Sequence, residues 1–280
     1  MNANPTKQRR FWRWIILLCV IIFFIPTMNW LIRQMVYPAP LLRVSSAPNG
    51  MEDLFFLISD DVQVHGWLHC NSAGDDSTPI MLFFHGNGEN LETMRMSGIL
   101  EDFQNLGVHF LAVDYPGYGR SGGSSSEAVL IEAADSSFAW IRENFPKNPK
   151  IIFGWSLGAA VAFQTAASHS QEIQGFIALS PWTSLSDVAA VHYPRWMVNS
   201  LLNEEYNSLS AAGKIYCPAL IIHGESDQII PAVQGEKVAA AMGAPPRWVK
   251  VPRTGHNDLL DRPLVWQEIE TFLNDINEKK

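Results

Sequence analysis

The chain has 280 residues, of which 47% are hydrophobic and 17% are charged, so it is long enough for one large domain and too apolar to remain disordered. Three cysteines without a CxxC pair argue against a disulfide scaffold or a cysteine-rich zinc module. The formal net charge is -8, and it becomes -13 after Arg33, where 15 basic and 28 acidic residues remain. A body this acidic repels phosphate backbones, which argues against nucleic acid as a partner.

The first predicted element is a membrane anchor at residues 14–32, preceded by a basic segment at residues 1–13. Between Arg13 and Arg33 lie 19 residues without a charge, enough for a helix of about 28 Å, close to the thickness of the bilayer core. The apolar run is flanked by tryptophans, as expected at the headgroup boundary: Trp12, Trp14 and Trp30. The basic residues before the run predict a single-pass protein with a cytoplasmic N-terminus and its remaining domain on the extracytoplasmic side.

A cleaved signal peptide is the alternative for this segment, because a basic start precedes the apolar Ile15–Ile25. No small-x-small cleavage site follows soon after it, so the sequence favours an uncleaved anchor. Residues 33–50 contain several prolines and serines and are expected to form a linker. The main domain is then expected at residues 51–280.

From residue 51 onward, short apolar segments typical of strands alternate with segments of helical spacing. The first two strands are expected to form a hairpin around Ser59-Asp60-Asp61. The predicted strands are Leu54–Ile58, Val62–His69, Ile80–Phe84, Val108–Val113, Ile151–Phe153, Phe176–Leu179, Ala219–Ile222 and Trp248–Val251. The predicted helices are Glu89–Leu106, Glu127–Asn144, Leu157–Ser168, Ala232–Met242 and Pro263–Ile276. This alternation predicts an α/β fold in which a mostly parallel, eight-stranded sheet carries helices on both faces.

One connection between predicted strands is unusually long. Residues 182–216 form a 35-residue segment, whereas a simple helical crossover needs about a dozen or more residues. The segment is either an ordinary crossover with aromatic core contacts or a small lid over a pocket, and the sequence does not decide between them. Its large apolar side chains make Trp182, Trp196 and Met197 candidate substrate-binding residues.

The strongest local motif is GWSLG, at residues 154–158. It follows the predicted strand Ile151–Phe153 and opens the predicted helix Leu157–Ser168. A serine on such a tight strand-to-helix turn projects its hydroxyl beyond the sheet, and the flanking glycines allow close approach of neighbouring backbone. The helix N-terminus behind it stabilises negative charge. Ser156 is therefore the candidate nucleophile.

A serine nucleophile needs a base and an acid, and both occur further along the chain. Asp227 follows the predicted strand Ala219–Ile222, and His256 follows the last strand. Both are then expected at the carboxyl edge of the sheet, where ligands bind in open α/β folds. The chain order of serine, aspartate and histidine is one of those known for catalytic triads.

Other carboxylates compete for the role of the acid. Glu225 is the closest rival, and we rank it second because it lies nearer to the end of its strand. Asp258 and Asp261 lie on the histidine's own loop, from which a side chain reaches the ring with difficulty.

An oxyanion site needs backbone N–H groups at the place where the tetrahedral oxygen forms. One candidate donor is the N–H of Leu157, directly after the nucleophile, and the other is the N–H of Asn87, in the sequence HGNG after the predicted strand Ile80–Phe84. His85 is either a second base or a residue that stabilises the turn, and we favour the second role because one base in reach is sufficient.

The sequence offers no pattern for a metal or another cofactor. The remaining histidines are scattered, and no HExxH or similar ligand spacing occurs. The glycines at residues 117–123 resemble a phosphate-binding loop only superficially, because no GK[ST] follows them, and they are typical of a wide turn.

Five segments, FFHGNGEN, VDYPGYGRSGG, GWSLG, HGESDQIIP and GHND, together resemble the α/β-hydrolase superfamily over about residues 52–278. They are similar in particular to a membrane-anchored serine hydrolase branch that includes bacterial inner-membrane homologues and eukaryotic acyl-protein thioesterases and lysophospholipid lipases. The resemblance implies the α/β-hydrolase fold, with Ser156 as nucleophile, Asp227 as acid and His256 as base. It also implies Asn87 and Leu157 as the oxyanion donors.

These observations predict a serine hydrolase that cleaves carboxylic ester or thioester bonds through an acyl-enzyme, on acyl or lipid-like substrates near a membrane. A serine at position 156 argues against the epoxide hydrolases and haloalkane dehalogenases of this fold, which need a carboxylate nucleophile. A serine peptidase of the same fold stays open as an alternative. A catalytically silent binding protein is disfavoured, because all three triad positions are filled.

Overall fold

The computed structural model describes residues 9–15, 20, 25–59 and 62–278. The chain divides into two compact units, Met1–Pro38 and Ala39–Lys280. In the first unit the described residues are helical at 9–15 and in α2 (Ile25–Val36). Over the described ranges no helix is long and apolar enough to span a bilayer.

The predicted anchor at 14–32 includes residues 16–19 and 21–24, which lie outside the described residues. The anchor and its orientation therefore stay predictions. Helix α2 does continue past the predicted end of the anchor at residue 32, so the first residues of the predicted linker are helical.

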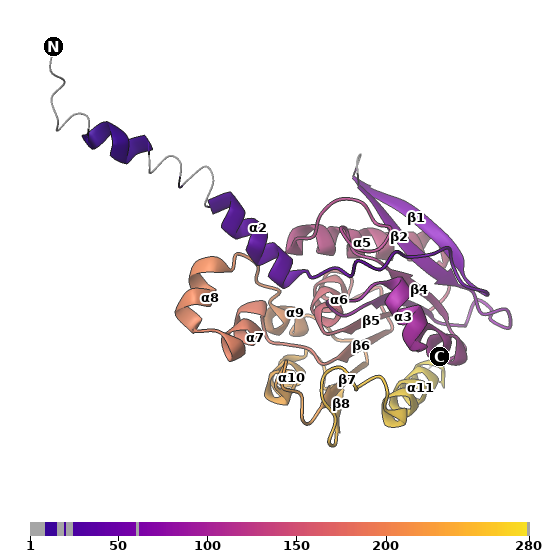
Figure 1. The fold of residues 1–280 in the computed structure, drawn as a ribbon. Helices are drawn as coiled ribbons and strands as arrows, with labels where there is room; N and C mark the ends of the chain where they lie inside the picture. The colour runs from indigo at the N-terminus through magenta and orange to yellow at the C-terminus, as the bar shows by residue number, and fades with distance from the viewer. Residues whose placement is uncertain (1–8, 16–19, 21–24, 60–61, 279–280) are drawn as a thin grey trace, which may run out of the picture. The chain divides into compact units, whose positions relative to one another are not determined.

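The second unit is built around one eight-stranded sheet (Figure 1). Its strands are β1 (Glu52–Ser59), β2 (Val62–His69), β3 (Ile80–Phe84), β4 (His109–Val113), β5 (Lys150–Trp155), β6 (Gly175–Leu179), β7 (Ala219–Gly224) and β8 (Arg247–Val251). They are arranged in the order β1-β2-β4-β3-β5-β6-β7-β8. Strand β2 is antiparallel to β1 and β4, and the other neighbouring strands are parallel. The prediction of a mostly parallel, eight-stranded sheet is confirmed, while two residues of the predicted hairpin turn, 60–61, lie outside the described residues.

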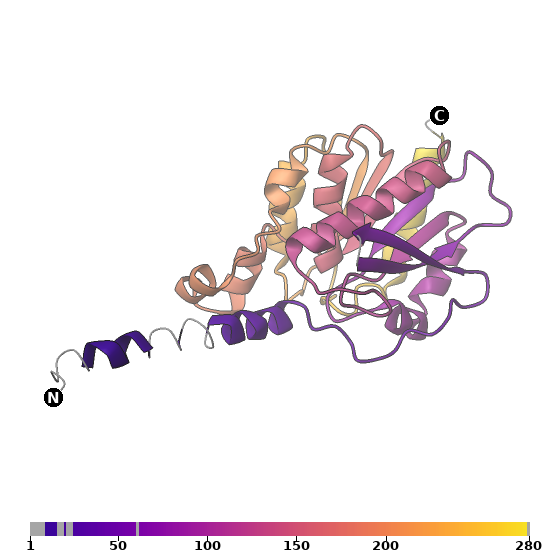
Figure 2. The same ribbon diagram turned by 90° about the horizontal axis from the view of Figure 1, so that it is seen from above.

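Helices cover both faces of this sheet (Figures 1 and 2). On one side lie α3 (Leu91–Ser97), α4 (Ile99–Asn105) and α11 (Pro263–Glu278), and on the other lie α5 (Glu127–Asn144), α6 (Leu157–Ser168), α9 (Ser208–Ala212) and α10 (Ala232–Ala241). The central strands are buried along their whole length, because a sheet covered on both faces places apolar side chains on each side of it. Phe83, Phe103 and Phe153 meet edge to face at centroid distances of 4.7–5.6 Å, which joins α4 to β3 and β5.

The single helix predicted at Glu89–Leu106 is wrong. Gly98 separates α3 from α4, and its backbone is in the left-handed region, with φ 83°. A residue there ends a helix, and glycine adopts this conformation without the steric penalty of a Cβ. The helical spacing on either side of Gly98 continues because both short helices pack onto the same face of the sheet.

Residues 182–216, here called the insertion, contain α7 (Leu185–His192), α8 (Arg195–Leu201) and α9. Helix α9 packs against α6 and α10, as a crossover helix would. Helices α7 and α8 instead pack against each other and extend away from the sheet (Figure 1). The insertion thus combines a covering helix with a projecting helical hairpin.

The body-side part of the predicted linker is held against α3. Ser45 donates from both its backbone N and its Oγ to Glu92 Oε2, at 2.9 and 2.7 Å. The Asn90 side-chain amide, next to the start of α3, donates to the Leu42 carbonyl at 2.8 Å. The chain that enters the domain is therefore tied to the segment that follows β3.

Candidate active site

Ser156 occupies a sharp turn between β5 and α6. Its backbone has φ 56° and ψ -114°, a conformation that is uncommon for a residue with a side chain. The Ser156 N–H donates to the Leu179 carbonyl at the end of β6, at 2.9 Å, which holds the turn to the neighbouring strand. Strain of this kind concentrates at functional sites, where surrounding structure enforces it.

The two glycines of the GWSLG motif are required by close backbone contacts. A Cβ added to Gly154 would lie 2.1 Å from the Gly158 carbonyl oxygen, and one added to Gly158 would lie 2.0 Å from the Phe84 carbonyl oxygen. Both distances are far below van der Waals contact, so a side chain at either position displaces backbone. The turn that presents Ser156 is possible because both positions lack a Cβ.

The structure brings the three predicted triad residues into contact. His256 Nε2 lies 2.9 Å from Ser156 Oγ, and His256 Nδ1 lies 2.7 Å from Asp227 Oδ2. An ionised carboxylate only accepts hydrogen bonds, so Nδ1 carries the proton and Nε2 of the neutral ring accepts from the serine hydroxyl. All three residues are buried, with exposed fractions of 6–8%.

Asp227 is held by more partners than His256 alone. Its Oδ1 accepts from the backbone N–H groups of Ile229 and Ile230, at 2.9 and 2.8 Å, and its Oδ2 lies 3.3 Å from His223 Nε2. Burial by itself raises the pKa of Asp227, but the hydrogen bonds from His223 and His256 outweigh it and hold that pKa well below its usual range. The carboxylate is thus ionised and oriented.

The competing carboxylates are engaged elsewhere. Glu225 is exposed and accepts from the Arg253 backbone at 3.4 Å. Asp258 accepts from the Gly255 backbone at 2.7 Å and pairs with Arg262, so it shapes the histidine's loop. Asp261 is exposed at the far end of that loop.

The HGNG loop lies directly against the serine turn. A Cβ on Gly86 would be 3.2 Å from the Trp155 ring, and a Cβ on Gly158 would be 2.6 Å from the His85 carbonyl oxygen. Asn87 Oδ1 accepts from the Tyr118 hydroxyl at 2.8 Å. The Leu157 N–H belongs to the first turn of α6, where N–H groups have no acceptor within the helix. The two predicted donors therefore belong to two segments in contact.

His85 is enclosed rather than presented to a reacting group. Its ring is fully buried, with the rings of Tyr115 and Tyr118 at centroid distances of 4.4 and 5.6 Å. Its Nδ1 lies 2.9 Å from the Gly86 carbonyl, and its Nε2 lies 3.5 Å from an Asp114 carboxylate oxygen. These contacts support a role in shaping the loop.

The predicted substrate-binding residues lie on different parts of the insertion. Trp182 follows β6, is 5% exposed and packs edge to face on Tyr206 at 6.3 Å. Trp196 is 73% exposed on α8, and the neighbouring Met197 is half-buried. Their role in substrate binding stays a prediction.

Several residues that shape this site were not predicted from the sequence. His223 contacts the predicted acid Asp227, and Tyr115 and Tyr118 hold the HGNG loop. These residues belong to the motifs HGESD and DYPGYG, which were recognised in the sequence. The contacts that their side chains make depend on which strands are neighbours in the sheet.

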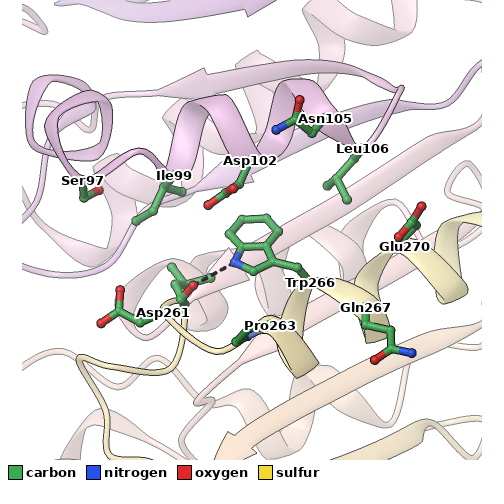
Figure 3. A pocket seen from close by; sticks show the side chains of 11 residues that line it. Ser97, Ile99, Asp102, Asn105, Leu106, Asp261, Pro263, Trp266, Gln267 and Glu270 are labelled. Atoms are coloured by element: carbon green, nitrogen blue, oxygen red, sulfur yellow. Dashed lines mark hydrogen bonds between the residues drawn. The ribbon is translucent and has the colours of Figure 1, made fainter.

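A cavity of about 550 Å³ lies between α4 and α11, away from the triad (Figure 3). Trp266 lies across it, with its Nε1 donating to the Leu260 carbonyl at 2.8 Å, and Asp102, Asp261 and Glu270 surround the ring. The triad residues are not among its lining residues. In the described part of the chain no group of His, Cys, Asp and Glu side chains is arranged to hold a metal ion, and Cys70 and Cys217 are unpaired thiols.

Comparison with known proteins agrees with this fold. The family model for the alpha/beta hydrolase fold matches residues 79–204. An uncharacterized protein of Mycobacterium tuberculosis is 34% identical over 250 residues, 87% of each chain. The lysophosphatidylserine lipase ABHD12 of Danio rerio is 28% identical over 178 residues, 58% of this chain and 47% of that protein. The esterase Pf2001 of Pyrococcus furiosus superposes with a TM-score of 0.69 at 22% identity, over 85% of this chain and 98% of that one.

The chain therefore belongs to the α/β-hydrolase superfamily, as its sequence motifs indicated. The alpha/beta hydrolase family model and the lipase relative support hydrolase activity.

Proposed function

We propose that this protein is a serine hydrolase that cleaves carboxylic ester or thioester bonds through an acyl-enzyme intermediate. The observation that carries the proposal is the pair of contacts from His256 to Ser156 Oγ at 2.9 Å and to Asp227 Oδ2 at 2.7 Å. A serine hydroxyl becomes nucleophilic when an adjacent base accepts its proton, and a third group orients that base.

In the proposed reaction, Ser156 Oγ attacks the acyl carbon while its proton passes to His256 Nε2. The carbonyl oxygen becomes an oxyanion, which the N–H groups of Asn87 and Leu157 stabilise. When the intermediate collapses, His256 returns the proton to the departing alcohol or thiol. Water then attacks the acyl-enzyme, again with His256 as base, and Ser156 is restored. Asp227 stabilises the imidazolium that forms in each half-reaction.

The substrate we propose is an acyl ester or thioester of small or lipid-like character. The names of the zebrafish lipase and the archaeal esterase support ester substrates. The exposed Trp196 and the half-buried Met197 give the projecting hairpin an apolar surface suited to an acyl chain. The uncharged run between Arg13 and Arg33 supports a location at a membrane, with the N-terminus cytoplasmic and the catalytic domain on the other side.

Covalent labelling tests the nucleophile. A fluorophosphonate probe is expected to label the wild-type protein and to fail on Ser156→Ala. His256→Ala should lose about as much esterase activity as Ser156→Ala, because the two act as a unit. Labelling that survives Ser156→Ala would place the nucleophile elsewhere.

A panel of acyl chains tests the substrate. Each added methylene should raise kcat/KM by up to about fourfold until the site is full, since burying a methylene contributes about 0.8 kcal/mol. Trp196→Ala with Met197→Ala should flatten this trend, whereas Leu209→Ala, on α9, should preserve it. Fastest turnover on acetyl substrates would contradict the acyl-chain proposal, and faster cleavage of amides than of esters would favour a peptidase.

Protease accessibility tests the location. Protease added to intact spheroplasts should digest the domain after residue 38 and leave the N-terminal segment protected. Protection of the domain until lysis would reverse the proposed orientation.

A further inference from the structure

Glu89 is a carboxyl group on the loop between β3 and α3 that the proposed reaction does not use. Its Oε2 is buried and makes no hydrogen bond within the part of the chain that the structure describes. Burial raises the pKa of Glu89 because it removes solvent from the carboxyl group, and the nearby His85 lowers that pKa to a smaller extent. The net effect is a pKa of about 7. Glu89 as a whole is half-buried, so a charge on it would be poorly solvated on the side of Oε2.

The groups around Glu89 offer little compensation for a charge. His85, on its own loop, and Tyr115, after β4, interact with it electrostatically. Tyr115 itself interacts electrostatically with three further groups, Asp114, Tyr118 and Tyr206. Burial alone would raise the pKa of Asp114, but hydrogen bonds from His65 and His85 lower it, so His85 already faces one carboxylate. A charged Glu89 would be the second carboxylate around that imidazole.

The loop that carries Glu89 is held on both sides. Asp114 Oδ1 accepts from the Leu91 N–H at 3.0 Å and lies 3.5 Å from His85 Nε2, so one carboxylate touches the loop before and after Glu89. The Tyr118 hydroxyl holds Asn87 at 2.8 Å. These contacts fix the backbone on either side of Glu89.

This loop is also the one that supplies a proposed oxyanion donor. The proposed donor Asn87 precedes Glu89 by two residues, which span at most about 7 Å of backbone. A negative charge on this short loop opposes an oxyanion that develops at the Asn87 N–H, and at about 10 Å and the effective dielectric of a protein the opposition is about tenfold in rate.

We propose that Glu89 must be neutral for turnover, and that its ionisation beside the HGNG loop limits the activity of the protein at alkaline pH. When Glu89 is neutral, the Asn87 and Leu157 N–H groups stabilise the oxyanion without opposition. When Glu89 is ionised, its negative charge repels the oxyanion and offsets part of that stabilisation. Because the effect is on the transition state, it appears in kcat and leaves KM of an uncharged ester nearly unchanged. This inference rests on the proposed serine hydrolase function.

The test is the pH profile of the full-length protein on an uncharged p-nitrophenyl ester between pH 5.5 and 9.5. Wild type should lose about tenfold in kcat above pH 7, whereas Glu89→Gln should keep its plateau and match wild type at pH 6. Glu101→Gln removes the same charge from an exposed position on α4 and should retain the wild-type decline. A decline that persists in Glu89→Gln would overturn the proposal.

The rate of fluorophosphonate labelling, measured over the same pH range, separates this inference from the proposed function. Labelling needs no particular acyl substrate, yet it also builds negative charge beside the HGNG loop. If no ester or thioester is cleaved but labelling declines in wild type and not in Glu89→Gln, the hydrolase proposal fails and the role of Glu89 stands. If labelling of the two proteins has the same pH dependence, the role of Glu89 is wrong.

Discussion

Gly158 and Phe84 are in such close contact that a Cβ on the glycine would lie 2.0 Å from the phenylalanine's carbonyl oxygen. The first turn of α6 therefore presses on the end of β3, where the HGNG loop begins. The proposed nucleophile Ser156 and the proposed oxyanion donor Asn87 come from chain segments about 70 residues apart, and this contact sets their spacing. In this protein the serine turn and the HGNG loop form one packed unit.

Gly158→Ala should consequently disrupt the site. The added methyl group has to displace backbone, so we expect a loss of about 1–3 kcal/mol in the free energy of unfolding and a loss of most activity. Gly122→Ala is the matched control, because its Cβ would lie 3.7 Å from the nearest atom, in ordinary contact. Chemical denaturation and a kinetic assay measure both effects. Equal behaviour of the two variants would show that the close contact does not matter.

Asp227→Asn should lower kcat by up to about 10⁴-fold, the effect known for the corresponding change in a serine protease, because the amide favours the wrong histidine tautomer. Glu225→Gln alters the rival carboxylate, which is exposed and bonded to the Arg253 backbone, and should stay within about twofold of wild type. Steady-state kinetics of both variants on one ester decides which carboxylate is the acid. A larger loss in Glu225→Gln than in Asp227→Asn would reassign the acid.

Glu89 should also make the stability of the protein depend on pH. Its pKa is about 7 in the folded protein against an ordinary 4.5, so the unfolded chain ionises first as pH rises. The contribution of Glu89 is therefore most favourable below about pH 4.5, falls between pH 4.5 and 7, and is lower by about 3 kcal/mol above that.

Urea unfolding at pH 5 and pH 8 measures this linkage. The free energy of unfolding of Glu89→Gln, relative to that of wild type, should be higher at pH 8 than at pH 5. For Glu101→Gln the difference from wild type should be the same at both pH values. A difference between Glu89→Gln and wild type that does not change with pH would mean that Glu89 titrates normally.

Glu127 should hold the loop between α8 and α9 in place. Its two carboxylate oxygens accept from the backbone N–H groups of Glu205 and Tyr206, at 2.6 and 2.7 Å, and Tyr206 has the uncommon φ of 42°. Glu127→Ala should raise hydrogen exchange at residues 205 and 206 by about 10- to 150-fold, because hydrogen bonds to a charged acceptor contribute about 1.5–3 kcal/mol. Glu132→Ala, exposed on the same helix, is the control, and equal exchange in both variants would contradict this role.

The secondary structure of the central domain was largely accessible from the sequence. Continuous apolar runs such as Ile80–Phe84 predicted buried strands, and the predicted bounds of α5 and α6 agree with the structure. The split at Gly98 was missed because the helical spacing of apolar residues continues across it. Both short helices face the same core, so the pattern carries no sign of the break.

The local chemistry was accessible as well, because a serine between two glycines at a strand-to-helix turn is defined by a few adjacent residues. The sequence alone determined the candidate nucleophile, the order in which acid and base follow it, and the parallel sheet that brings strand ends to one edge.

Which groups meet at that edge was decided by tertiary structure. His256 and Ser156 are 100 residues apart, and the choice of Asp227 over Glu225 depends on which carboxylate points at the ring. The same holds for His223 beside Asp227 and for the desolvated carboxyl of Glu89. Sequence patterns report the burial and conformation of neighbouring residues, whereas the direction of a side chain and its loss of water depend on segments that only folding brings together.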